Sequence, residues 1–168
     1  HPTSIVAPAK PAASYLHMAV RIKRIRLWRT EVPSRPGALA EALEPLAQGN
    51  ADLKVIRGRA TPAAAGRLTI EVYAGEGKRA AMVARAAGFS LVPSTTVLLQ
   101  GDNRPGLAYA VANAVAWAGI GVRNLDAEVV GIRYSVILTF NSEDDAEKAV
   151  AVIRKVTRGG AARNSRTQ

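Results

Sequence analysis

The sequence lacks cysteine altogether, and its two histidines, His1 and His17, both lie near the start of the chain. The absence of cysteine excludes disulfides, thiolate nucleophiles and cysteine-ligated metals. Beyond residue 17 the chain also lacks histidine, the commonest general base and metal ligand. No glycine-rich phosphate loop and no paired-carboxylate motif takes their place. We therefore expect neither an enzyme nor a bound cofactor.

Aromatic residues are scarce at 5%, and no apolar run approaches the length of a membrane-spanning helix. The net charge is +10, but basic residues gather towards the two ends, whereas every acidic residue lies between Thr30 and Ile153. A nearly neutral centre with few aromatics does not suit nucleic-acid binding, which uses basic faces and stacking rings. We expect no membrane or nucleic-acid partner and, since cysteine is absent, a cytoplasmic location.

The segment 1–17 is rich in proline, alanine and serine and shows neither helical nor strand periodicity. It ends in a His17-Met18 junction, which is what a common cloning site encodes. We expect 1–17 to be a vector-derived leader, with the natural start at Met18.

The body of the chain repeats itself. Arg35-Pro36-Gly37 recurs in the second half as Arg104-Pro105-Gly106, and an apolar stripe at helical spacing follows each motif. The first stripe comprises Leu39, Ala42, Leu43, Leu46 and Ala47; the second comprises Leu107, Ala110, Val111, Ala114, Val115 and Ala118. Both motifs thus sit at the start of a predicted helix, where proline is tolerated.

Strands at 51–59 and 121–130 follow these helices, and each is followed by a strand with alternating apolar residues. The inward positions are Leu68, Ile70 and Val72 in one copy and Ile132, Tyr134, Val136, Leu138 and Phe140 in the other. A second helix closes each copy: Ala80, Val83, Ala84 and Ala87 recur, all at one offset, as Ala146, Ala149, Val150 and Ile153. The same offset relates Leu68 to Tyr134, and its constancy through strand and helix indicates a true repeat.

First strands are predicted at 22–32 and 95–100, and a short fourth strand at 89–92. Each copy reads βαββαβ, an α+β fold of ferredoxin-like type with two helices on one face of an antiparallel sheet. The predicted units are 20–94 and 95–156, followed by a basic flexible tail at 157–168. The second copy shows no fourth strand, so we expect another segment, the N-terminal arm or a second subunit, to pair with its open sheet edge.

A βαββαβ unit with Arg-Pro-Gly at the strand-to-helix turn, present twice, resembles the tandem ACT-domain regulatory proteins over about Ile22 to Val156. The resemblance implies two units joined side by side as a pseudo-dimer, a homodimeric assembly and a small effector, typically an amino acid. It also implies control of a partner such as a regulated enzyme.

In that family, ligands contact the strand-to-helix turn of one unit and the second strand of its neighbour. The implied ligand residues in the first copy are Ser34, Arg35, Pro36, Gly37, Ala38, Leu39, Asp52 and Leu53; in the second they are Asn103, Arg104, Pro105, Gly106, Leu107, Gly121 and Val122. The chemistry agrees, because a helix N-terminus offers free N–H groups to a carboxylate and Asp52 could pair with an α-ammonium group.

Three other interpretations remain open. Ser34 and Asn103 could act only as helix N-caps, and Asp52 could be a solvated turn residue. Because Ser34 and Asp52 differ from Asn103 and Gly121, the ligand sites could be degenerate and the chain a protein-interaction or dimerisation module.

Overall fold

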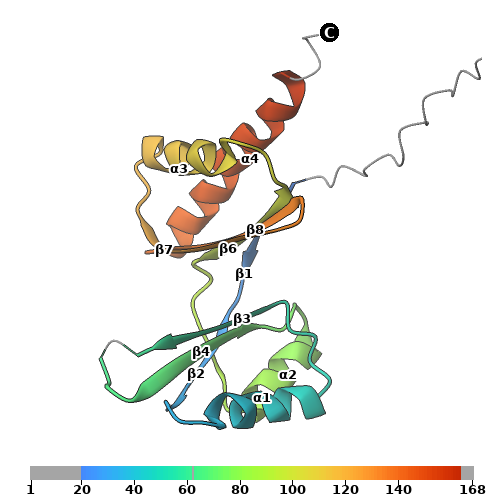
Figure 1. The fold of residues 1–168 in the computed structure, drawn as a ribbon, viewed down its shortest axis with the longest axis vertical. Helices are drawn as coiled ribbons and strands as arrows, with labels where there is room; N and C mark the ends of the chain where they lie inside the picture. The colour runs from blue at the N-terminus through green and yellow to red at the C-terminus, as the bar shows by residue number, and fades with distance from the viewer. Residues whose placement is uncertain (1–19, 62, 164–168) are drawn as a thin grey trace, which may run out of the picture.

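The computed structural model describes residues 20–61 and 63–163, which form two four-stranded antiparallel sheets with two helices on each (Figure 1). The first unit contains β2 (Trp28–Pro33), α1 (Ala38–Gln48), β3 (Val55–Ala60), β4 (Arg67–Tyr73), α2 (Lys78–Ala86) and β5 (Ser90–Leu91). The second contains β1 (Arg21–Ile25), β6 (Thr96–Asp102), α3 (Leu107–Trp117), β7 (Val122–Val130), β8 (Arg133–Phe140) and α4 (Glu143–Arg163).

The strand orders β3-β4-β2-β5 and β1-β6-β8-β7 confirm two ferredoxin-like units. Each unit buries most of the apolar face predicted from its periodicity against its own helices, but Leu39 and Ile132, which were predicted to face inward, are 44% and 56% exposed. The first core contains Trp28, Leu46, Ile70, Val72, Ala84 and Phe89. The second contains Val97, Leu99, Leu107, Val111, Val115, Ile120, Tyr134, Leu138, Phe140, Ala146, Ala149 and Ile153. The repeat in the sequence is therefore a repeat of whole cores.

The segment predicted as one strand at 22–32 is two strands in different sheets, so that prediction is wrong. β1 pairs antiparallel with β6, from Arg21 opposite Gln100 to Ile25 opposite Thr96, whereas β2 pairs with β4 in the first unit. β1 occupies the place of the missing fourth strand and covers the open edge. Residues 21–25 thus belong to the second sheet, and the first unit does not begin at residue 20.

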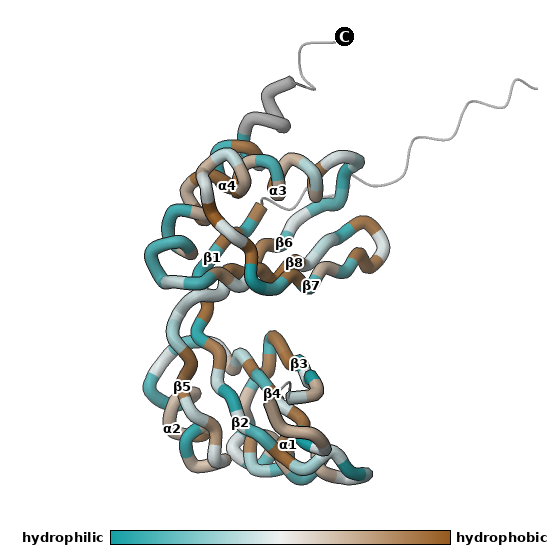
Figure 2. Tube along the Cα trace, turned by 90° about the vertical axis from the view of Figure 1, so that its left-hand side faces the viewer, coloured by the Kyte–Doolittle hydropathy of each residue, from teal (hydrophilic) through white to brown (hydrophobic). Residues whose placement is uncertain are grey.

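The two sheets stack face to face with all helices on the outside (Figures 1 and 2). The side-by-side arrangement that the resemblance implied is therefore wrong. The cause is the burial of apolar side chains. Ile25, Val55, Tyr73 and Leu98 on the sheet faces away from the helices, together with Leu27 in the connection from β1 to β2, bury one another as a third core between the units. Joining the sheets edge to edge would leave these side chains in water.

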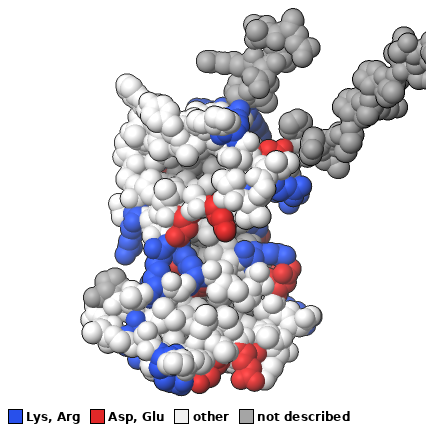
Figure 3. Space-filling model, in the orientation of Figure 1, with Lys and Arg blue, Asp and Glu red and all other residues white. Residues whose placement is uncertain are grey.

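Charged side chains complete the contact between the sheets and gather at the waist of the molecule (Figure 3). Arg57 from β3 donates to Glu71 on β4 at 2.5 Å and to Asp126 on β7 at 3.0 Å, and Arg59 also pairs with Asp126. Arg29 donates from Nε and Nη2 to the other carboxylate oxygen of Glu71, Oε1, at 2.9 and 2.6 Å. The two units are therefore joined through a network in which arginines of the first unit bind a carboxylate of the second.

The C-terminal part differs from its prediction as well. α4 runs to Arg163, so residues 157–163 extend a helix and are not a flexible tail. Its extension buries Thr157, whose hydroxyl donates to the carbonyl of Ile153 at 2.9 Å. The remainder of that tail and the predicted leader at 1–17 lie outside the described residues. Within the described ranges, no helix has both the length and the apolarity to cross a membrane.

Candidate functional site

The two Arg-Pro-Gly turns have the same backbone structure, one between β2 and α1 and the other between β6 and α3. Gly37 and Gly106 adopt φ of 86° and 80°, a left-handed conformation in which a β-carbon is strained. Ser34 N–H donates to the carbonyl of Gly66 and Asn103 N–H to that of Ile132, both at 2.7 Å. These bonds tie each turn to the hairpin of its own unit.

The helix N-cap positions are the glycines Gly37 and Gly106, and neither helix receives a side-chain cap. The interpretation of Ser34 and Asn103 as N-caps is therefore wrong. Their side chains are exposed and leave the capping of the helix to the backbone of the turn. Asn103 is thus available for contacts other than capping.

Charged residues at the first turn already neutralise one another. The Arg35 guanidinium forms a fork with the carboxylate of Glu41 at 2.6 and 2.9 Å, and this hydrogen bonding lowers the pKa of Glu41. Asp52 is exposed and pairs with Lys54. The Asp52 carboxylate, predicted to pair with the α-ammonium group of a ligand, is thus already paired within the chain. Among the other predicted residues, Ala38 is buried, Leu53 packs against the first core, and Ser34, Pro36, Gly37 and Leu39 are exposed.

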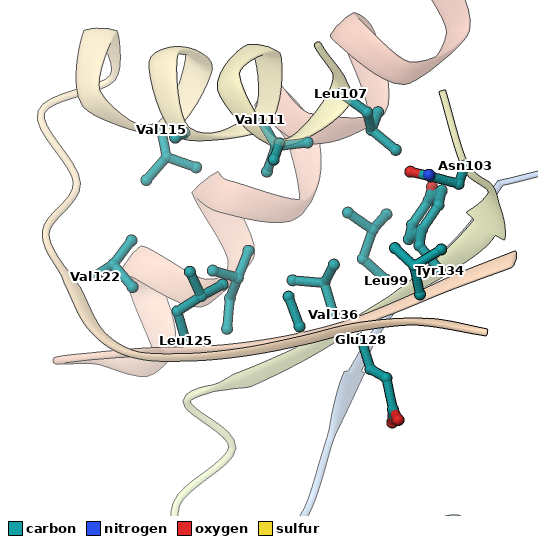
Figure 4. A pocket seen from close by; sticks show the side chains of 15 residues that line it. Leu99, Asn103, Leu107, Val111, Val115, Val122, Leu125, Glu128, Tyr134 and Val136 are labelled. Atoms are coloured by element: carbon teal, nitrogen blue, oxygen red, sulfur yellow. The ribbon is translucent and has the colours of Figure 1, made fainter. Parts of the chain in front are cut away.

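The second turn stands at the end of a hollow of about 380 Å³, which we call the α3 cavity. It lies between α3 above and strands β7 and β8 below (Figure 4). Its walls are Leu99, Asn103, Leu107, Ala108, Val111, Ala112, Val115, Val122, Leu125, Ala127, Glu128, Val129, Tyr134, Val136 and Leu138. Ligand pockets in proteins have this character, a largely apolar hollow with a few polar groups.

Of the predicted ligand residues, the structure brings Asn103, Leu107 and Val122 together in this wall. Arg104 is half-buried in the turn, while Pro105, Gly106 and Gly121 are exposed beside it. The two turns do not share a groove, because α1 and α3 lie on opposite outer layers of the molecule (Figure 1). The walls of this cavity all belong to the second unit, so the cavity does not combine the turn of one unit with the second strand of its neighbour.

Polar groups are few in the α3 cavity and gather near the second turn. Figure 4 shows the Tyr134 ring directed towards Asn103, while the Glu128 carboxylate points out of the cavity on the other side of the sheet. Tyr134 is 4% exposed, and its hydroxyl has no hydrogen-bond partner among the described residues. Gly101 makes room for it, since a β-carbon at this glycine would stand 2.8 Å from the hydroxyl oxygen.

The pKa of Tyr134 is raised. Burial is the main cause; the positive charge of Arg104 acts against it, and the negative charge of Asp102 adds to it. The phenol therefore stays protonated and can donate a hydrogen bond at any physiological pH. Sequence reasoning found Tyr134 as an inward-facing strand residue but missed it as a site residue.

A second hollow of about 510 Å³ lies between the two sheets and is lined by Arg29, Arg57, Glu71 and neighbouring polar residues. Burial raises the pKa of Glu71, but the hydrogen bond from Arg29 and the charge of Arg57 outweigh burial and hold this pKa below its usual value. Within this hollow, Arg29 and Arg57 both donate hydrogen bonds to the carboxylate of Glu71. The described residues bring no group of three or more acidic or histidine side chains into a metal-binding arrangement.

No family model matches the sequence, and no curated protein matches it either. Solved structures do. Protein BT0572 from Bacteroides thetaiotaomicron has a TM-score of 0.62 at 16% identity, over 77% of this chain and 88% of that chain. The ligand-free regulatory subunit of aspartate kinase from Thermus thermophilus has a TM-score of 0.54 at 15% identity, over 83% of this chain and 97% of that chain.

The aspartate kinase of Synechocystis aligns with 90% of this chain at a TM-score of 0.55 and 18% identity, but over only 29% of the enzyme. The match therefore covers a part of that protein only. At such identities the likeness concerns the fold alone, and the chain shares its fold with regulatory subunits of aspartate kinase.

Proposed function

We propose that this chain is a tandem ACT-type regulatory module of the cytoplasm that binds an amino acid at the second Arg-Pro-Gly turn. The α3 cavity carries the proposal, because an apolar hollow beside a helix N-terminus offers an amino acid both a side-chain pocket and free N–H groups. The regulatory subunits of aspartate kinase, which have a similar fold, support the regulatory part of the proposal. A ligand that binds one arrangement of the two units better than another would transmit its presence to a partner enzyme.

The first turn serves a structural purpose in this proposal. Arg35 and Asp52, the groups that would meet a zwitterion there, are engaged by Glu41 and Lys54. The module then has one working site for each chain, in the second unit. Catalysis is not part of the proposal, since the groups that face the cavity are a neutral phenol, an amide and hydrocarbon.

Calorimetry on the full chain with each of the twenty amino acids tests the proposal. We expect at least one to bind, and Asn103→Ala to weaken this binding about tenfold, the loss of roughly one hydrogen bond. Ser34→Ala is the matched control, because Ser34 has the same place in the first turn; it should leave binding unchanged. Absence of heat with every amino acid would contradict the proposal.

A second candidate function, homodimerisation, is supported by the outer edge of the second sheet. β7 is an edge strand, and its side chains Leu125 and Val129, which also line the open side of the α3 cavity, are 59% and 52% exposed. Val130 and Ile132, at the hairpin end, are exposed too, although alternation predicted that Ile132 faces inward. An exposed apolar edge strand invites pairing with another copy. Sedimentation velocity of the wild type and of Val130→Lys tests this; a monomer at every concentration would contradict it.

A further inference from the structure

The α3 cavity has one polar end and one hydrocarbon end, and this asymmetry says what kind of molecule it accepts. Near the second turn stand the Asn103 amide and the Tyr134 hydroxyl (Figure 4). At the far end the wall consists of Val115, Val122 and Leu125. A ligand with one polar end and an apolar body matches this distribution, whereas a ligand charged at both ends would bury a charge against hydrocarbon.

The Tyr134 hydroxyl points to a ligand independently of the helix terminus. Buried polar groups in folded proteins nearly always have a hydrogen-bond partner, and one without a partner needs an explanation. Among the described residues this hydroxyl has none, although it is buried in the wall of a cavity large enough for a small molecule. A bound ligand that accepts its hydrogen bond supplies the missing partner.

The surroundings of this hydroxyl suit the main-chain end of an amino acid. Arg104 and Asp102 lie close enough for their opposite charges to act on Tyr134. α3 begins beside this end of the cavity, with Leu107 and Ala108 in the wall, and a carboxylate is favoured near a helix N-terminus. The polar end of the cavity therefore combines a positive helix end, a phenol donor and an amide.

We infer that the ligand is an amino acid with a large apolar side chain, aliphatic or aromatic, which lies under α3 while its carboxylate accepts hydrogen bonds from Tyr134 and the start of α3. The inference rests on the proposed function and narrows it to a ligand class. It also places the ligand inside a single unit, between a helix and its own sheet.

Competition among ligands on the full chain tests this class. Each additional buried methylene should tighten binding about fourfold. Leucine should therefore bind about 50-fold more tightly than alanine. Serine, aspartate and lysine should bind no better than alanine. Tighter binding of a polar or charged amino acid would overturn the inference and leave the proposed function standing. Binding of 4-methylpentanoate as tightly as leucine, with no preference for the amino group, would overturn the proposed amino-acid effector and keep the apolar class.

Two variants locate the ligand. Ala112→Leu fills the cavity and should abolish leucine binding, while Ala116→Leu makes the same change on the same helix at a position outside the cavity wall and should not. Unchanged affinity in Ala112→Leu would place the ligand elsewhere and overturn the inference.

Tyr134→Phe separates a binding role from a structural one. Removing a hydroxyl that has no partner among the described residues should leave the thermal stability unchanged or raise it, while leucine affinity falls about tenfold. A fall in stability with unchanged affinity would show that the hydroxyl serves the fold, and the inference would fail.

Discussion

The two units have corresponding strand orders and two helices each, yet the α3 cavity belongs to the second, and a few side chains of the first helix differ between them. When the two Arg-Pro-Gly motifs are aligned, Leu43 and Leu46 of α1 correspond to Ala112 and Val115 of α3. The strand below the helix also has a smaller side chain in the second unit, since Trp28 of β2 corresponds to Val97 of β6. Smaller side chains on an unchanged backbone leave unfilled space. In a duplicated fold, one copy can thus have a filled core while the other contains a cavity.

The largest expected effect compares two leucines on the corresponding helices. Leu46→Ala should lower the free energy of unfolding by about 4 kcal/mol, because Leu46 is fully buried in the filled core. Leu107→Ala should cost about 2 kcal/mol, since Leu107 already faces the cavity on one side. Urea titration of both variants measures the difference. Equal costs would mean that the second core is as well filled as the first.

The next effect concerns the charges that hold the units together. Glu71→Gln should destabilise the chain by about 1.5–3 kcal/mol, because the two arginines lose a buried carboxylate. Chemical denaturation measures the loss. Glu31→Gln is the control: it removes an exposed carboxylate that stands 3.7 Å from Arg67, and should change stability little. Equal losses in the two variants would show that burial of the Glu71 network contributes nothing.

The same carboxylate predicts a pH dependence. The pKa of Glu71 is lower in the folded chain than its ordinary value of about 4.3. Its contribution to stability is therefore fully present above that ordinary value and is lost as the pH falls through the folded pKa. Thermal unfolding of the wild type should become easier in this acidic window, and Glu71→Gln should flatten the dependence. A wild type and variant with parallel pH profiles would exclude Glu71 as the cause.

A smaller effect is expected when α3 is given the side chain that α1 has at the corresponding position. Ala112→Leu introduces the side chain that α1 has at Leu43 and should leave stability unchanged or raise it by up to about 1 kcal/mol, since the space is empty. Ala42→Leu, in the packed first unit, should cost about 1–3 kcal/mol through overpacking. Differential scanning calorimetry of both variants measures the two stability changes. If Ala112→Leu lowered the stability more than Ala42→Leu, the unfilled volume would lie in the first unit.

The smallest effect separates the two turns. Asp52→Asn removes an exposed ion pair with Lys54 and should alter stability by less than about 0.5 kcal/mol. Amino-acid affinity, measured by the same calorimetry as for Asn103→Ala, should not change. A loss of affinity in Asp52→Asn would show that the first turn also binds ligand.

Local patterns were sufficient to predict both units, their helices and most of their inward-facing strand residues, because these depend on periodicity. They failed at the start of the chain. The sequence from Arg21 to Trp28 contains no glycine or proline to mark the break between β1 and β2, and the choice of β6 as the partner of β1 depends on contacts far away in sequence. The candidate site shows the same contrast: the turn residues Asn103 and Leu107 follow from the motif, whereas the buried hydroxyl of Tyr134 is a result of packing.

The exchange of β1 has a consequence for how the chain comes to be folded. The strand that leaves the ribosome first among the described elements belongs to the sheet that is finished last, opposite β6. β1 therefore has no β6 to pair with until the whole first unit has been synthesised. A protease that cuts between Ile25 and Trp28 would consequently detach the edge strand of the second unit, and a gene divided at its apparent midpoint would encode a second half without that strand.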